Sequence, residues 1–118
     1  MFGVAEDIDL TGLVGRKLQR ISIGVERFEL GFDDGWLLNI ECAWRLDGSA
    51  GLIVEAERDT LLDSVDQLTR LVGAVVEFAV PRPPDRIEID LGEKGRLVLI
   101  DDSDMLESFS IEPIGIIV

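Results

Sequence analysis

Two stretches of the chain alternate apolar and polar residues in the same way. The first runs from Phe28 to Phe32 and the second from Ile87 to Leu91, with an apolar side chain at every second position. A period of two is typical of a β-strand with one buried face. The pattern therefore predicts two strands whose apolar faces meet in a shared core.

Each of these strands leads into a turn and a further strand. Asp33-Asp34-Gly35 follows the first strand and Gly92-Glu93-Lys94-Gly95 the second. Asp and Gly tolerate the positive φ that tight hairpins require. After the first turn we expect one long strand from Trp36 to Leu46, with its even-numbered residues facing inward. After the second, Leu97–Ile100 is apolar on both faces, as in a strand covered on both sides.

An earlier strand opens each unit, and the two units read as copies. We expect the strands at 17–23 and 74–80, with these side chains facing inward: Ile21, Ile23, Val76, Phe78 and Val80. Leu13-Val14-Gly15 precedes the first strand and Leu71-Val72-Gly73 the second. The sequence therefore predicts a single domain, 1–118, with an internal duplication of about 13–46 and 71–111.

Between the copies the period of the pattern changes. Leu52–Val54 reads as a short strand, and apolar residues then recur at helical spacing. Those residues are Leu61, Leu62, Val65, Leu68, Leu71 and Val72. Thr60 with Asp63 resembles a capping box, and Gly73 suits the position after a helix end. These signals predict one α-helix at about 60–72.

Together the elements predict an α+β, mainly β fold. We expect seven to nine strands in two related antiparallel β-meanders, packed as a pseudo-twofold sandwich or a partly open barrel with the helix over one open end or face. The tail reads as a strand at 108–111 followed by the apolar residues 114–118. An apolar end strand has to be covered. We expect its own sheet to cover it, and the alternative is a homodimer through this strand.

The charge balance narrows the classes of partner. The chain carries 24 acidic and 11 basic residues, a formal net charge of −13. The basic residues are scattered, which argues against nucleic-acid binding because phosphate contacts need clustered Lys and Arg. An excess of carboxylates can steer a protein toward a basic protein partner, and the alternative is that it only keeps a small protein soluble. No apolar stretch is long enough to span a bilayer, so no membrane role is expected. One cysteine and an N-terminus without a secretory pattern favour the cytoplasm.

The residue types available argue for binding and against catalysis. The chain has no histidine, no tyrosine and one cysteine. Ser–His and Cys–His nucleophilic pairs and the usual zinc sites are therefore excluded. No Gly-rich segment leads from a strand into a helix, so no phosphate-binding loop is expected. We predict a non-catalytic protein without cofactor or metal. A carboxylate-dependent hydrolase, which needs two carboxyl groups facing each other across a cleft, is the remaining enzymatic alternative.

The densest polar cluster follows the strand that ends at Ile100. It comprises Asp101, Asp102, Asp104 and Glu107. Oxygen ligands at this density suit a hard cation such as Ca²⁺, which makes metal or small-ligand binding the alternative function. The glycine and the twelve-residue spacing of an EF-hand are absent. The structural interpretation is a turn in which Asp and Ser bond to nearby backbone N–H groups.

The first hairpin turn is the other candidate for partner binding. Asp33 and Asp34 suit the turn itself, and Trp36 beside it is of a residue type enriched at interaction hot spots. The structural alternative is that Trp36, Cys42 and Trp44 pack as core residues on one inner face. The candidate partner-binding residues are thus Asp33, Asp34, Trp36, Asp101, Asp102, Asp104 and Glu107.

Several of these motifs together resemble a family of small uncharacterised bacterial domains. The resemblance is carried by Leu13–Arg16, Phe32–Gly35, the strand around Trp44, and Asp101–Ile111. In that family a tyrosine tends to stand near the position of Leu106, where this chain departs from the pattern. The family supplies no activity and no binding residues. Some of its members look like small acidic immunity proteins encoded beside toxins, which implies an immunity- or antitoxin-like role in protein binding.

Overall fold

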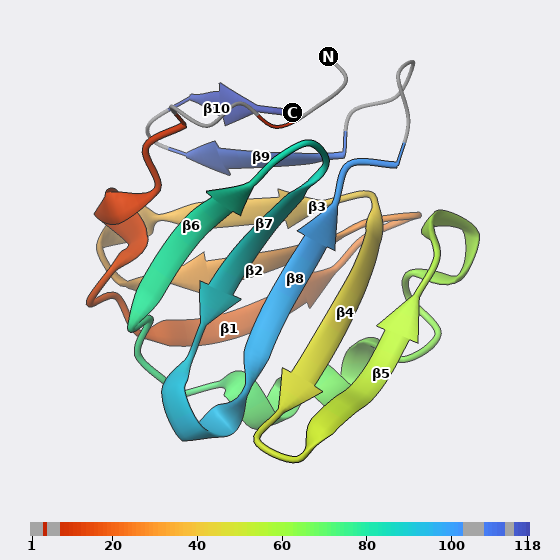
Figure 1. Cartoon of the computed structure of the whole chain (residues 1–118), viewed down its shortest axis with the longest axis horizontal. Coiled ribbons are helices and arrows are strands. Elements are labelled where there is room, and N and C mark those ends of the chain that lie inside the picture. The colour runs from red at the N-terminus through yellow and green to blue at the C-terminus, as the bar shows by residue number, and fades with distance from the viewer. Residues whose placement is uncertain (1–3, 5–7, 103–107, 113–114) are drawn as a thin grey trace.

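The computed structural model describes residue 4 and residues 8–102, 108–112 and 115–118. The strands of these residues form two antiparallel sheets of five strands each (Figure 1). The first sheet has the order β1 (Leu18–Ile23), β2 (Phe28–Phe32), β3 (Leu37–Ile40), β9 (Phe109–Glu112) and β10 (Ile116–Ile117). The second has the order β5 (Gly51–Ala56), β4 (Ala43–Gly48), β8 (Arg96–Ile100), β7 (Arg86–Asp90) and β6 (Phe78–Arg82).

The apolar faces of the two sheets meet in one core. Phe28 and Leu30 of β2 and Ile87 and Ile89 of β7 are all buried and belong to a single hydrophobic cluster. Alternation along each strand directs these side chains to the same interior, as their period of two requires. The predicted mainly β sandwich of two antiparallel meanders is confirmed, and its sheets do not close into a barrel.

The two meanders are β1–β3 and β6–β8. Each forms a sheet with a hairpin from the other half of the chain. In the first sheet β3 pairs with β9, with Leu38 opposite Ile111. In the second sheet β8 pairs with β4, with Leu97 opposite Leu46. The hairpin β4–β5 therefore completes the sheet of the second meander, and the hairpin β9–β10 completes the sheet of the first.

This exchange corrects the prediction of one long strand from Trp36 to Leu46. The strand breaks at Glu41 and Cys42, where the chain crosses from β3 in the first sheet to β4 in the second. All even-numbered residues from 36 to 46 are nevertheless buried. The alternation survives because both sheets face the same core. A period-two pattern alone therefore cannot reveal a crossing between sheets.

A short ladder of hydrogen bonds joins the segments before the two meanders. The Gly15 N–H donates to the Val76 carbonyl and the Gly73 N–H to the Leu18 carbonyl, both at 2.8 Å. The bonds from Leu18 to Ala74 and from Val76 to Arg16 are both 2.9 Å. Gly15 and Gly73 are 58 positions apart, and each bond maps onto its counterpart by this same shift. Two copies of one unit around a twofold axis would make this ladder.

The segment that joins the halves is helical where predicted, but it is not an α-helix. It contains the 3₁₀ helices η3 (Arg58–Thr60) and η4 (Val65–Leu71). The buried residues of η4 are Val65, Leu68 and Leu71, which are spaced by three. A 3₁₀ helix has three residues per turn, so this spacing places all three on one face. The capping box pairs Glu57 with Thr60 in place of Thr60 with Asp63, and Gly73 has a φ of +94°.

Short 3₁₀ turns occupy three other places. They are η1 (Thr11–Leu13), η2 (Asp33–Gly35) and η5 (Gly92–Lys94). The last two link β2 to β3 and β7 to β8, so both predicted hairpin turns are confirmed. Asp34 and Gly35 have positive φ values of 59° and 78°, the conformation that Asp and Gly tolerate best.

Some strands at the edges differ from the prediction. Ile23, expected inside, is 62% exposed because β1 is an edge strand that ends in a projecting hairpin tip. In β6 the buried residue is Ala79, and Phe78 and Val80 are only partly buried. Val76, in the segment before β6, is buried as expected, so the inward positions shift by one residue between Val76 and Ala79. At the other end, β10 pairs with β9 in its own sheet and Val118 is buried. None of the described helices is long and apolar enough to cross a membrane.

Candidate functional site

The first hairpin turn gathers three of the predicted site residues around Arg16. The Arg16 guanidinium lies 4.3 Å from the centre of the Trp36 ring, and its Nη1 lies 2.9 Å from Asp34 Oδ2. Asp33 Oδ1 is 4.0 Å from the same nitrogen. Trp36 is only 8% exposed, and a side chain at Gly12 would collide with its ring. In this arrangement Trp36 packs as a core residue, while Asp34 remains exposed beside its ion pair.

The second predicted cluster follows β8, where the chain crosses from the second sheet to β9 in the first. Asp101, 2% exposed, accepts a hydrogen bond of 2.8 Å from Ser108 Oγ. Asp102 accepts the Ala43 N–H at 3.0 Å and the Arg58 Nε and Nη2 groups at 2.9 and 2.6 Å. These bonds tie the end of β8 to the start of β4, the start of η3 and the start of β9.

The binding of a metal ion gains no support from this cluster. Asp104 and Glu107 lie outside the described residues. Asp101 and Asp102 direct their oxygens at Ser108, Ala43 and Arg58. Among the residues that the structure describes, no three His, Cys, Asp or Glu side chains come together in a group that could hold a metal ion. These contacts correct the structural interpretation of this turn, because the donors are the Ser108 hydroxyl, the Arg58 guanidinium and the N–H of Ala43 on another strand, and not local backbone N–H groups.

Cys42 lies at the crossing from β3 to β4, near Asp102, and is fully buried. Burial raises the pKa of its thiol to about 12, and the nearby carboxylate of Asp102 adds to the rise. Both effects disfavour the thiolate, which is the reactive form of cysteine. Cys42 therefore packs as a small apolar side chain, as the sequence predicts.

Sequence reasoning missed an acidic groove at one end of the sandwich, with a volume of about 540 Å³. It lies between the tip of the β1–β2 hairpin, the crossing at Glu41 and the segment that contains η3. Its lining residues are Val25, Glu26, Glu41, Arg58, Asp59, Leu61, Leu62 and Asp63. In Figure 1 the β1–β2 tip and the loop after β5 lie on the same side of the molecule.

The acidic groove combines negative charge with exposed apolar surface. It has four carboxylates and one guanidinium, and that guanidinium, of Arg58, is already bonded to Asp102. Val25 at the hairpin tip is 88% exposed. An apolar residue at a turn, where polar residues are usual, is the one local signal that could have pointed here. The carboxylates come from three separate segments, so their convergence could not be predicted.

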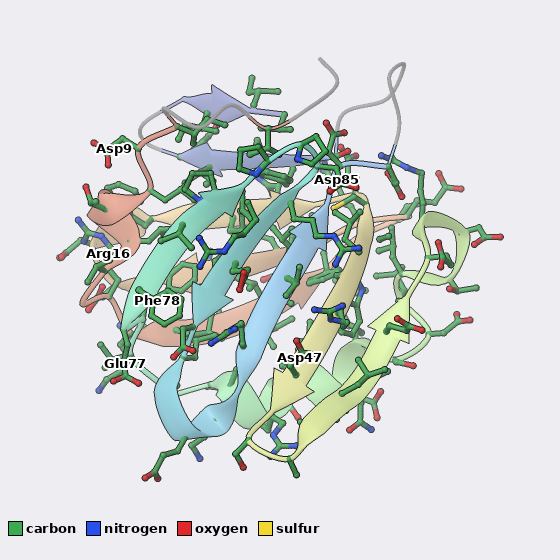
Figure 2. The ribbon with its side chains drawn as sticks, in the orientation of Figure 1. Asp9, Arg16, Asp47, Glu77, Phe78 and Asp85 are labelled. Atoms are coloured by element: carbon green, nitrogen blue, oxygen red, sulfur yellow. The ribbon has the colours of Figure 1, made fainter. Side chains whose placement is uncertain are left out.

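A second cavity, of about 560 Å³, lies on the outer face of the second sheet. Figure 2 shows this face with Asp47 on β4 and Phe78 on β6. In contrast to the acidic groove, most of its charged lining residues form ion pairs. Arg45 Nε lies 3.1 Å from Asp47 Oδ1, and Arg96 reaches Glu88 at 3.2 Å and Asp90 at 3.4 Å. The pairs of Arg96 join β8 to β7, and opposite charges on neighbouring strands stabilise a sheet face, so these pairs have a structural role.

Comparisons with protein-family models, with curated proteins and with solved structures found no match to this chain.

Proposed function

We propose that this protein is a non-catalytic protein-interaction module that binds a basic protein through the acidic groove. Its mode of action would be that of an immunity- or antitoxin-like inhibitor, which occupies a basic surface of its target. The observation that carries the proposal is the meeting of unpaired carboxylates, the exposed Val25 and the partly buried Leu62 around one cavity. Interfaces of this kind gain specificity from charge complementarity and affinity from apolar contacts.

The carboxylates of the groove differ from those that form ion pairs elsewhere in the molecule. Elsewhere Asp34, Asp47, Glu88 and Asp90 each lie within 4.0 Å of an arginine nitrogen. Four groove carboxylates have no ion pair with any described residue, namely Glu26, Glu41, Asp59 and Asp63. Their uncompensated field attracts cationic groups and raises the rate of encounter with a basic partner.

The absence of catalysis is proposed from the side chains that the chain possesses. It has no histidine to serve as a general base near neutral pH. Its one thiol is buried, with a raised pKa. The carboxylates therefore serve as points of attraction for a partner in this proposal, and not as acids or nucleophiles.

Affinity capture from the native host, with matched charge reversals, tests the proposal. One variant combines Glu26→Lys with Asp63→Lys in the groove. The control combines Glu93→Lys with Glu112→Lys, which are exposed acidic residues on η5 and β9 away from the groove. Both variants change the net charge by the same amount. We expect the wild type and the control to retain a basic partner at low ionic strength and to release it at about 0.5 M salt, where charges are screened within a few ångströms.

The groove variant should lose the same partner at every salt concentration. Recovery of no basic protein by the wild type at low ionic strength would refute the proposal. Equal losses in the two variants would also refute it, because the net charge and not the groove would then set the binding.

A further inference from the structure

The two halves of the molecule differ at the segment that lies beside the first hairpin tip of each meander. In the repeat Gly15 is equivalent to Gly73. The similarity extends to earlier residues, since Leu10–Gly15 reads LTGLVG and Leu68–Gly73 reads LTRLVG. The same shift of 58 positions makes Val4 equivalent to Leu62. The tip of the β6–β7 hairpin is likewise the counterpart of the β1–β2 tip that borders the acidic groove.

In the second half Val4 closes the space beside the β6–β7 tip. The Val4 N–H donates a hydrogen bond of 2.7 Å to the carbonyl of Pro84 at the β6–β7 tip, and Val4 is only 4% exposed. In the first half Leu62 and Val25 line an open cavity. Among residues 24–27 and 58–63, all of them described, no backbone hydrogen bond joins the hairpin tip to the segment opposite. The acidic groove is therefore open where its counterpart is filled.

We infer that the acidic groove accepts an extended segment of a basic partner, with a branched apolar side chain between Val25 and Leu62. The inference rests on the proposed function and specifies the ligand. The apolar side chain would fill the gap between the β1–β2 tip and Leu62, the counterpart of Val4. Lysine or arginine side chains on either side of it would then face Glu26, Glu41, Asp59 and Asp63. An extended segment at a hairpin tip can also use its backbone groups, as Val4 does with Pro84.

Charge argues against a second copy of this chain as the occupant. Val4 is the residue that closes the counterpart, and in the sequence Glu6, Asp7 and Asp9 follow it. In the acidic groove these side chains would meet four carboxylates of the same sign. Like charges brought together at an interface oppose binding. A basic segment avoids this repulsion and is the occupant that the surface favours.

Titration of the ¹⁵N-labelled full chain with three heptapeptides, followed by NMR at low ionic strength, tests the inference. The first peptide has a central valine between two glycines, with two lysines at each end. The second replaces the valine with serine, and the third replaces the four lysines with glutamates. The valine–lysine peptide should shift the amide signals of residues 24–27, 41 and 58–63. It should bind about fivefold more tightly than the serine peptide, because only valine has apolar surface to bury.

A variant of the protein gives the reciprocal control. Val25 is exposed, so Val25→Ser leaves the core intact. In this variant the difference between the valine and serine peptides should fall to less than about half, while binding of the lysines persists. The glutamate peptide should shift none of these signals in either protein.

The outcomes separate the two proposals. If both lysine peptides bind the groove with equal affinity, the inference about the apolar side chain is wrong and the proposed function stands. If neither lysine peptide shifts groove signals, or if the shifts lie on another face, both proposals are wrong.

Discussion

Asp101 and Asp102 are adjacent carboxylates that accept hydrogen bonds from different donors where the chain leaves β8. Asp101 points into the protein and accepts a hydrogen bond from Ser108 Oγ. Asp102 holds the Ala43 amide and the Arg58 guanidinium. A partly buried carboxylate needs such donors, because burial of an unpaired charge is costly. The acidic run at 101–102 therefore serves to anchor the chain where it leaves β8.

Cys42 provides a prediction at the scale of a single residue. The pKa of its thiol is about 12 in the folded protein, against an ordinary value near 9. Between these values the folded state keeps the proton and the unfolded state loses it, so stability falls as the pH rises. The loss should reach about 2 kcal/mol at pH 10.5, at 1.36 kcal/mol per pH unit.

The measurement is urea denaturation of the wild type and Cys42→Ala from pH 8 to 10.5. The chain has no tyrosine and its only lysines are Lys17 and Lys94, so few other side chains titrate in this range. The substitution should remove most of the alkaline loss, whatever it does to stability at pH 8. Parallel pH profiles of the two proteins would contradict the assigned pKa.

Individual positions differ in how far the sequence predicts them. The burial of Phe28, Leu30, Ile87 and Ile89 follows from alternation alone, because a strand with one polar face has one orientation. The roles of Arg16 at Trp36 and of Arg58 at Asp102 could not be predicted. These contacts depend on the relative placement of loops, for which no local pattern exists.

At the scale of elements, the exchanged hairpins are the feature that local sequence conceals. Each strand and each turn has its own local signal, and the residues of the hairpins were predicted as strands. The choice of partner for β4 and β9 has no such signal, since either sheet would offer their apolar faces the same core. The spacing of three between Val65, Leu68 and Leu71 is typical of a 3₁₀ helix, but the same residues also fit the apolar face of an α-helix.

Substitutions in the last hairpin test its place in the first sheet. Ile111 is fully buried opposite Leu38, whereas Ile117 on β10 is 56% exposed. Ile111→Ala should reduce the free energy of unfolding by about 2–5 kcal/mol, through lost burial and the cavity left behind. Ile117→Ala, which removes the same atoms from a neighbouring strand, should cost less than about 1 kcal/mol. Urea denaturation of both variants measures the difference, and similar losses would contradict the packing of β9 described above.

At the scale of the whole molecule, the excess of negative charge opposes the compact state. A net charge of −13 on 118 residues repels itself once the chain folds. Salt screens this repulsion over about 10 Å at 0.1 M. The ion pairs that salt also weakens are mostly half exposed and worth at most about 1 kcal/mol each.

We therefore expect the melting temperature to rise with salt. An increase from 20 to 500 mM NaCl should raise it by roughly 4 °C, the shift expected for about 1 kcal/mol in a domain of this size. Differential scanning calorimetry measures the change. A fall in the melting temperature would show that the paired charges outweigh the unpaired ones.

The exchange of hairpins also sets the order in which this molecule can be made. Once β8 has emerged from the ribosome, all five strands of the second sheet are present and can assemble. The first sheet still lacks β9, the strand that pairs with β3 at its centre. The sheet that contains the earliest strands to emerge is thus the last to be completed, and its apolar face stays accessible to chaperones until β9 has emerged as well.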